Sequence, residues 1–372
     1  MTYKGYTILD GDGHIIEDLA GISKLMPEVY HAPFKAGHPF YKPFGPLDHM
    51  HCTSLLDFMP GSFNFLTGPK EWQEFAGKVG VDASVLYPTW GLAVGKITDV
   101  QFSVDVCRAY NDWLHQTYMK RSPVFKGVCL LPMDDVEAAV AELRRAVKEL
   151  GMCGAMLAST GFQSHLGHKR YWPIYEEADR LGCALAVHGG AHENFGMDDL
   201  SPFAAVHALG HPFGQMICFA SVVFHGLCDR FPRVKWAFLE GGVAWFLLCL
   251  ERFEGSYAGF TPNDTGKRFF DIKKGEKVFD YIARHVDAGR LFVGCEGDEP
   301  NLVDAVRDIG DKPFVFSSDF PHEVNIESCQ HEIDELLEND KLTRANKEAI
   351  LSGNARRLYG LKVEAKTEKA AA

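Results

Sequence analysis

The chain has 372 residues, of which 46% are hydrophobic and 24% are charged, a composition typical of a globular protein with a large core. Its formal net charge of -12 argues against a nucleic-acid partner, because phosphate binding needs clustered Lys and Arg. The longest apolar run, residues 243–250, is far shorter than a membrane span, and residues 1–14 hold no apolar run of signal-peptide length.

Eight short apolar segments recur along the chain, each ended by Gly, Pro or a polar residue. Their nearly continuous hydrophobicity is typical of strands that are covered on both faces. In chain order, the predicted strands are Thr7–Asp12, Ser84–Pro88, Lys126–Leu131, Gly154–Ser159, Ala184–His188, Lys235–Glu240, Leu291–Glu296 and Phe314–Asp319.

Stretches with helical spacing lie between these segments. Val136–Leu150 is the clearest, because apolar residues recur every three or four positions and Gly151 follows directly. Val100–Lys120, Ile174–Leu181 and Ile326–Leu337 show a similar pattern. The repeated strand–helix alternation predicts an α/β fold, a closed (β/α)8 TIM barrel, in preference to a doubly wound sheet.

Residues 19–75 interrupt this rhythm with a stretch rich in Pro, Gly, His and aromatic residues. The stretch follows the first strand, where a barrel carries a loop over its active-site mouth, so we predict an inserted lid. We expect residues 1–361 to form a single metal-dependent TIM-barrel domain. Residues 362–372, rich in Lys, Glu and Ala, are expected to be a peripheral tail.

Carboxylate and imidazole side chains stand at the carboxyl ends of five predicted strands, the rim from which barrel enzymes draw their catalytic groups. Such a mixture of ligands suits Zn, Mn or Fe. Residues two apart in a strand point the same way, so Asp12 and His14 both face the barrel axis. With His188 and Asp319 from across the barrel they form a four-ligand site that leaves room for water or substrate.

Four motifs together resemble the amidohydrolase-related family, which includes the aminocarboxymuconate-semialdehyde decarboxylase-like enzymes. They are Asp10-Gly11-Asp12-Gly13-His14-Ile15-Ile16-Glu17, Val187-His188-Gly189-Gly190, Ser317-Ser318-Asp319-Phe320-Pro321-His322 and Gly353-Asn354-Ala355-Arg356-Arg357-Leu358. The resemblance covers nearly the whole chain. It implies one metal ion held by Asp12, His14, His188 and Asp319, with Asp319 also able to act as a general base.

The chain departs from these decarboxylases at Glu240, where they have a catalytic His. A carboxylate donates a proton at neutral pH only if its pKa is strongly raised, which argues against the family's usual route of decarboxylation. The remaining pattern resembles a branch of non-haem diiron monooxygenases on the same barrel. That resemblance implies a second metal ion, held by residues from several strand ends: Glu17, His192, His225, Glu240 and His322.

We therefore expect two Fe ions and a monooxygenase that hydroxylates a small carboxylic-acid-type substrate, with Asp319, Glu240 and His322 in the catalytic machinery. In mononuclear members Glu17, Glu240 and His322 only hydrogen-bond to metal ligands, so His192 and His225 carry the case for a second ion.

Two alternatives stay open. One is a redox-neutral hydrolase or decarboxylase of the same family with one Zn or Mn, and the other is a largely non-catalytic partner subunit of an oligomeric enzyme. In each case we expect a small organic acid as ligand, a homo- or hetero-oligomer and no membrane partner. The chain lacks G-x-G-x-x-G after a first strand, a P-loop and G-x-S-x-G, so no nucleotide cofactor is predicted.

Several further residues are set aside. His207 and His211 have a metal-capable spacing on a helix but lack the Glu of the zincin motif, so we interpret them as structural or pocket-lining. The ten cysteines contain no C-x-x-C pair, and several lie in or beside apolar strands. We expect buried free thiols and a cytoplasmic protein.

Overall fold

The computed structural model of the chain describes residues 3–32, 43–44, 47, 66–192, 194–197, 199–200, 202–260, 272–273 and 275–362. Eight parallel strands follow one another in the sheet in chain order, so the predicted (β/α)8 barrel is confirmed. All eight predicted strands are present: β1 (Ile8–Ile15), β2 (Val81–Pro88), β3 (Phe125–Cys129), β4 (Gly154–Ala158), β5 (Ala184–His188), β6 (Lys235–Phe238), β7 (Leu291–Cys295) and β8 (Phe314–Phe316).

The segment that follows β8 closes the barrel against β1. The backbone N–H of Asp319 donates to the carbonyl of Asp12 at 3.0 Å, and that of His14 donates to the carbonyl of Phe320 at 2.7 Å. These two hydrogen bonds join β1 to the segment that follows β8. As a result, residues from the first and the last strand lie side by side at the mouth of the barrel.

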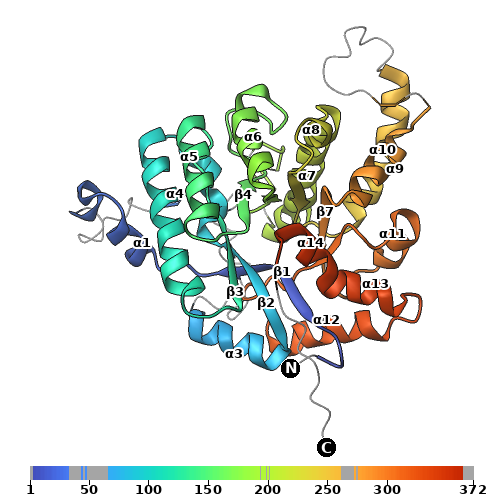
Figure 1. The fold of residues 1–372 in the computed structure, drawn as a ribbon, viewed down its shortest axis with the longest axis horizontal. Helices are drawn as coiled ribbons and strands as arrows, with labels where there is room; N and C mark the ends of the chain where they lie inside the picture. Colours follow the sequence, from blue (N-terminus) through green and yellow to red (C-terminus); the bar gives the residue numbers. More distant parts are fainter. Residues whose placement is uncertain are drawn as a thin grey trace, which may run out of the picture.

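Helices surround the strands as an outer ring, visible in Figure 1. The helical segments are α1 (Leu19–Leu25), η1 (Glu28–Tyr30), α3 (Pro69–Val79), η3 (Trp90–Lys96), α4 (Val100–Leu114), η4 (His115–Met119), α5 (Val136–Lys148), η5 (Lys169–Tyr171), α6 (Trp172–Leu181), α7 (Phe203–Phe224), α8 (Leu227–Arg230), α9 (Ala244–Phe260), α10 (Val278–Asp287), α11 (Leu302–Ile309), α12 (Ile326–Glu338), α13 (Arg344–Glu348), η7 (Ala349–Gly353) and α14 (Asn354–Tyr359). The four helices predicted from spacing are all found.

Local sequence explains where several of these helices begin. The side chain of Asp99 accepts a hydrogen bond from the backbone N–H of Phe102 at the start of α4, and Asp135 does the same for Ala138 at the start of α5. Such caps satisfy N–H groups that have no partner inside the helix. The buried face of α5 is apolar apart from Glu142, as the spacing of its residues predicts.

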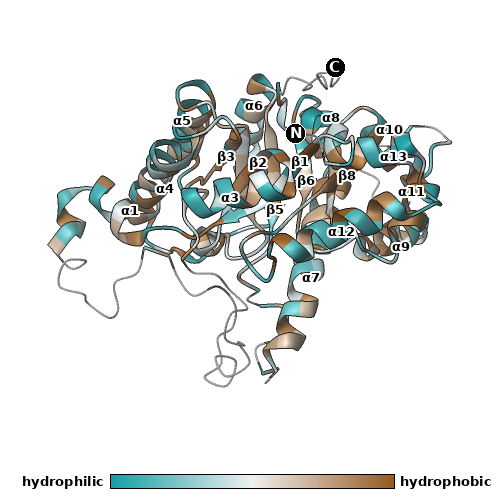
Figure 2. Cartoon of the chain, turned by 90° about the horizontal axis from the view of Figure 1, so that it is seen from below, coloured by the Kyte–Doolittle hydropathy of each residue, from teal (hydrophilic) through white to brown (hydrophobic). Residues whose placement is uncertain are grey.

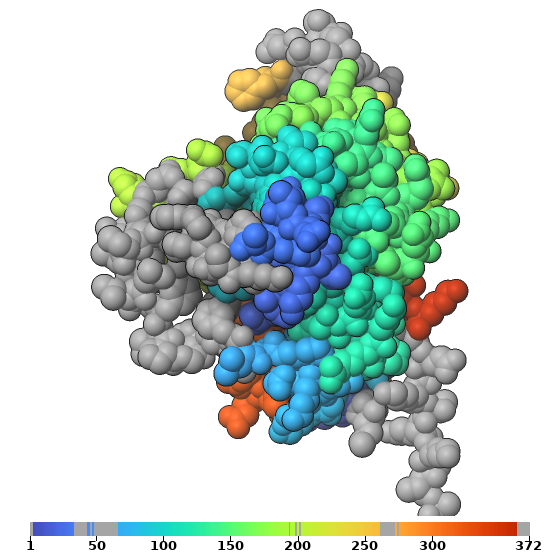
Figure 3. All heavy atoms as spheres, turned by 90° about the vertical axis from the view of Figure 1, so that its left-hand side faces the viewer, coloured from blue at the N-terminus to red at the C-terminus, as the bar shows by residue number. Residues whose placement is uncertain are grey.

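The predicted lid stretch, residues 19–75, begins and ends in regular structure. At its start, η1 is anchored to α4, because the ring of Tyr30 packs on Phe102 and its hydroxyl donates to Asp105. Figure 3 shows this segment on the outer surface, in dark blue. At its end, α3 buries Trp72 and Phe75 and belongs to the barrel wall. Most of the stretch between, like the predicted tail, lies outside the described residues, so the lid stays a prediction.

The apolar core fills the barrel and the layer between strands and helices, and the strands accordingly show as hydrophobic in Figure 2. One end of α7 projects beyond this body. Within the described part of the chain, no helix is long and apolar enough to cross a membrane.

Candidate metal centre

Four side chains from opposite sides of the barrel converge at its mouth. The Nε2 atom of His14 lies 3.6 Å from Oδ1 of Asp12 and 3.3 Å from Oδ1 of Asp319, and Nε2 of His188 lies 3.4 Å from Oδ2 of Asp12. These distances exceed the usual hydrogen-bond length of about 2.9 Å. However, two ligand atoms bound tetrahedrally to one ion at about 2.1 Å are about 3.4 Å apart. The spacing therefore fits an ion held by Asp12, His14 and His188, and Asp319 joins them through its approach to His14.

Three of the facing atoms are also buried without hydrogen-bond partners among the residues that the structure describes. They are Oδ1 of Asp12, Nε2 of His14 and Nε2 of His188. A buried polar atom left without a partner destabilises a protein by about 1–3 kcal/mol. A divalent cation would give these three atoms a partner at once, so the residues present fit the metal ion expected from the sequence.

Hydrogen bonds on the far side of each imidazole orient both histidines. Nδ1 of His14 donates to the carbonyl of Pro88 at 2.8 Å, and Nδ1 of His188 donates to that of Gly189 at 3.0 Å. Because carbonyl groups only accept, the proton sits on Nδ1 and the lone pair of Nε2 points to the cluster. Burial, followed by the neighbouring His322 and His188, lowers the pKa of His14 well below its usual range, so this imidazole is neutral.

A further carboxylate, Asp10, supports the cluster from behind. It is fully buried and accepts hydrogen bonds from Oγ of Ser84 at 2.5 Å, from the N–H and Oγ of Ser318, both at 2.9 Å, and from the N–H of Asp12 at 3.2 Å. Burial raises the pKa of Asp10 to about 6, although these hydrogen bonds oppose the shift. Asp10 therefore ties β1 to β2 and to the segment that carries Asp319.

Asp10 was not among the site residues predicted from the sequence. The signal was present, because Asp10, Asp12 and His14 alternate along β1 and residues two apart in a strand share a face.

His322 stands directly behind Asp319. Its Nδ1 lies 2.9 Å from Oδ1 of Asp319, its Nε2 lies 2.9 Å from Oγ1 of Thr89, and its ring stacks on His14 with 4.1 Å between the ring centroids. Burial lowers the pKa of His322, but the carboxylates of Asp319, Glu323 and Asp12 outweigh it, so the net shift is upward. His322 is thus placed to orient Asp319 and to share a proton with it.

Glu17 uses both of its carboxylate oxygens on the loop after β2. Oε2 accepts hydrogen bonds from the backbone N–H groups of Thr89 and Trp90, and Oε1 accepts one from Gly91 at 2.8 Å. Burial raises the pKa of Glu17 to about 7, against the effect of these hydrogen bonds. The structure therefore gives Glu17 a positioning role for this loop, not the predicted place at a second metal ion.

Replacing Glu17 by Ala is expected to lower the free energy of unfolding by about 3 kcal/mol, because three backbone donors lose a charged acceptor in a buried place. Urea denaturation measures this. Glu71→Ala is the matched control, since the exposed Glu71 accepts one backbone hydrogen bond, from Gly68, and its removal should lower stability by about 1 kcal/mol or less. Loss of bound metal from Glu17→Ala with unchanged stability would contradict this assignment.

The two histidines on which the second ion depended lie apart from each other. Nδ1 of His225 lies 2.8 Å from the carbonyl of Ser221, and its ring is 4.6 Å from that of His165. The helix separates it from His211 by 14 positions (225 minus 211), about 21 Å at 1.5 Å per residue. His192 lies 4.4 Å from the ring of His211 and accepts a hydrogen bond from the N–H of Gly190. Glu17, His192, His225, Glu240 and His322 therefore do not surround a common point.

Glu240 connects the cluster to α7. Its Oε2 lies 3.1 Å from Nδ1 of His188 and 3.1 Å from Nδ1 of His211. Its backbone has a left-handed φ of 53°, a strained conformation for a residue with a side chain that is often found at functional sites. Burial, followed by His192 and His207, lowers the pKa of His211 well below its usual range.

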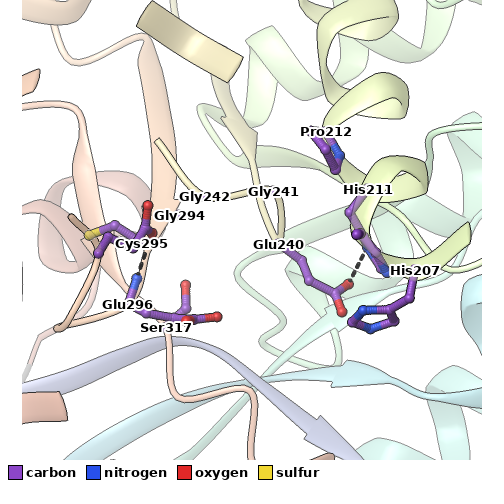
Figure 4. Close-up of a pocket in the computed structure, with 12 residues that line it drawn as sticks. His207, His211, Pro212, Glu240, Gly241, Gly242, Gly294, Cys295, Glu296 and Ser317 are labelled. Atoms are coloured by element: carbon purple, nitrogen blue, oxygen red, sulfur yellow. Dashed lines mark hydrogen bonds and ion pairs between the residues drawn. The ribbon is translucent and has the colours of Figure 1, made fainter. Parts of the chain in front are cut away.

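A cavity of about 210 Å³ opens beside Glu240. Figure 4 shows His207, His211 and Glu240 on one side of it and Glu296 and Ser317 on the other. A third carboxylate of the lining, Glu299, accepts hydrogen bonds from two backbone N–H groups. The residues that line the cavity thus include three carboxylates and two imidazoles but no Lys or Arg.

The chain is similar in sequence to a known enzyme family and to two decarboxylases. A family model described as Amidohydrolase matches residues 81–361. The 2-amino-3-carboxymuconate-6-semialdehyde decarboxylase of Dictyostelium discoideum is 27% identical over 282 residues, which cover 76% of this chain and 73% of that protein. The gamma-resorcylate decarboxylase of a Polaromonas species is 27% identical over 291 residues, 72% of this chain and 80% of that protein.

Among solved structures, the 5-carboxyvanillate decarboxylase of Novosphingobium aromaticivorans, complexed with manganese and a nitrobenzoic acid, has a TM-score of 0.69. It is 15% identical, and the match covers 97% of this chain and 98% of that one, so it supports the fold.

The expected function, a non-haem dinuclear iron monooxygenase, is wrong. Both relatives are decarboxylases, which catalyse a redox-neutral reaction. The expectation depended on His225, and a helix of 22 residues places that side chain far from the cluster. Two iron ions have no support either. The redox-neutral alternative fits these findings better.

Proposed function

The chain belongs to the amidohydrolase family, and on this premise we propose that it is a metal-dependent decarboxylase of a small aromatic carboxylic acid. The observation that carries the proposal is the convergence of Asp12, His14, His188 and Asp319 at the barrel mouth, in a chain whose relatives remove carboxyl groups. We propose an aromatic acid because the substrates for which those relatives are named contain a ring or a conjugated system.

We infer that the resident ion is manganese, with zinc as the alternative, because two carboxylates and two imidazoles suit both. The similar 5-carboxyvanillate decarboxylase structure contains manganese. A divalent ion supplies a Lewis acid that orients and polarises substrate oxygen atoms. Asp12, His14, His188 and Asp319 would hold it.

We assign proton transfer to the pair of Asp319 and His322, in which the imidazolium of His322 supplies the proton that the carboxylate of Asp319 passes on. When CO2 leaves, the bond between the carboxyl carbon and the ring breaks, and its electron pair stays on the ring carbon, which then takes up a proton. The side chain of Asp319 is 20% exposed, so it reaches the mouth, and His322 holds it at 2.9 Å. Glu240, which stands where similar decarboxylases have a His, positions His188 through the 3.1 Å contact to its Nδ1.

Hydrolysis is the second candidate, and Glu240 is the observation that favours it. Glu240 stands where the similar decarboxylases have a proton-donating His. Hydrolysis needs a general base, which Asp319 could supply, and no proton donor at the position of Glu240. The two candidates differ in the bond that breaks, so their products separate them.

Release of CO2 tests the proposal. Protein freed of metal with a chelator and reloaded with Mn²⁺ is expected to decarboxylate at least one of a panel that includes gamma-resorcylate and 5-carboxyvanillate, labelled with ¹³C at the carboxyl group. The metal-free protein should be at least about 100-fold slower. NMR detects the labelled CO2 and the decarboxylated ring. Hydrolysis of aryl esters or amides without CO2 from any acid would contradict the proposal and support the second candidate.

Two further predictions belong to this proposal. Nine free cysteines lie in the described part of the chain, eight of them buried, which supports a reducing, cytoplasmic location. Assembly into homo- or hetero-oligomers stays a prediction from the sequence.

A further inference from the structure

A second group of ligand atoms gathers beside the centre described above. His207 and His211 lie one turn apart on α7, with 5.1 Å between their ring centroids, and Glu240 reaches toward them from the end of β6. One ligand atom from each of the three residues lies within 4.8 Å of the other two. We propose that His207, His211 and Glu240 form a second divalent-cation site in the wall of the cavity.

The chemistry of the three donors supports this assignment. Two imidazoles and one carboxylate hold zinc in several hydrolytic enzymes and leave a fourth position open. Two histidines four residues apart project from the same face of a helix, which allows them to bind one ion. Nδ1 of His211 is buried and faces Oε2 of Glu240 at 3.1 Å, close to the separation of two ligand atoms on one ion.

The remaining gap between the donors is small. Two ligand atoms bound tetrahedrally to one ion at about 2.1 Å are about 3.4 Å apart. Donor atoms that lie within 4.8 Å of one another therefore have to close by at most about 1.4 Å. His207 is exposed, so its side chain has room to move toward the other two donors.

The negative charge of the cavity suggests that the second cation helps to bind an acidic substrate. This part of the inference rests on the proposed function. An aromatic acid carries a carboxylate, yet the lining of the cavity contains Glu240, Glu296 and Glu299 and no Lys or Arg. A cation at His207, His211 and Glu240 offsets these charges and offers the carboxylate of the substrate a partner at its open position. The cation would therefore supply positive charge and orient the carboxylate of the substrate.

The binding of Zn²⁺ alone to the full-length protein tests the site. After chelation and dialysis, the wild-type chain is expected to bind two Zn²⁺ ions in a calorimetric titration with metal analysis of the dialysed product. His207→Ala should weaken one of the two ions at least about tenfold and leave the other unchanged. Asp319→Asn should weaken the other ion instead. His331→Ala is the matched control, an exposed His of α12 paired with Glu335, and should still bind two ions.

These experiments test the second metal site independently of the proposed decarboxylase function, because the bound ions are counted in the absence of substrate. Thermal unfolding of each variant establishes that it is folded, and His207 is exposed, so its loss leaves the core intact. A single ion in the wild type, or two ions of unchanged affinity in both His207→Ala and His211→Ala, would overturn the second site. Two ions in a protein that releases no CO2 would overturn the proposed function alone.

Discussion

Replacing Asp319 by Asn is expected to lower kcat for decarboxylation by about 1,000-fold or more while the barrel stays folded. The amide keeps the size of the side chain but loses the negative charge that faces Nε2 of His14 at 3.3 Å. It also ends the 2.9 Å ion pair with His322 and removes one of the two groups to which we assign proton transfer. Steady-state kinetics with saturating Mn²⁺ measures the loss, and circular dichroism verifies the fold.

His225→Ala is the matched control for this experiment. His225 lies at the far end of α7, beside His165, and contributes to neither group of ligand atoms. Its loss should change kcat less than about twofold, in the range of a surface substitution away from special features. If Asp319→Asn keeps more than a tenth of the activity, the assignment of Asp319 as proton carrier and ligand is wrong.

Replacing Asp10 by Ala is expected to lower the free energy of unfolding by about 4 kcal/mol, the largest stability effect that we predict. Four donors, from Ser84, Ser318 and Asp12, would lose their acceptor in a fully buried place. Because Asp10 joins β1 to the segment after β8, the ligands Asp12 and Asp319 would also lose their alignment. Metal affinity should fall by about 10- to 100-fold, as for other groups that support metal ligands.

Urea denaturation of the metal-free protein measures this stability without a contribution from bound ions. Asp99→Ala provides the scale, because Asp99 caps α4 through one exposed hydrogen bond and its loss should lower stability by about 1 kcal/mol. An Asp10→Ala protein as stable as Asp99→Ala would show that the buried carboxylate does not hold the seam of the barrel.

The barrel itself was predictable from the sequence because strands covered on both faces appear as short, nearly continuous apolar runs. The exact ends of several strands were not predictable. Two of them matter for the site: the predicted strands ended at Glu240 and Asp319, but β6 and β8 end at Phe238 and Phe316. Glu240 and Asp319 instead adopt left-handed backbone conformations, with φ of 53° and 52°, and turn out of the sheet toward the cluster. A pattern of residue types does not reveal such a turn.

The convergence of Asp12, His14, His188 and Asp319 follows from a rule of position, since all four lie at the carboxyl ends of parallel strands. The second set was harder to foresee. Its helical part, His207 and His211, lacks the Glu of a known motif, and the third ligand atom comes from Glu240, on a different element. Contacts of this kind depend on how a helix packs on its neighbouring strand, which spacing along the chain does not show.

His225 illustrates the opposite error. It stands shortly before β6 in the sequence, and the resemblance to the diiron branch implied that it binds a second metal ion. However, α7 runs for 22 residues along the outside of the barrel and places His225 14 positions beyond His211. The resemblance therefore misled where a long helix intervened.

Anomalous diffraction locates the one divalent ion that Asp12, His14, His188 and Asp319 are proposed to hold. Crystals of the protein loaded with Mn²⁺ should show an anomalous difference peak at the manganese absorption edge, about 2.1 Å from the facing atoms of all four side chains. An empty position between these four residues, in crystals of protein that is active with Mn²⁺, would contradict the account.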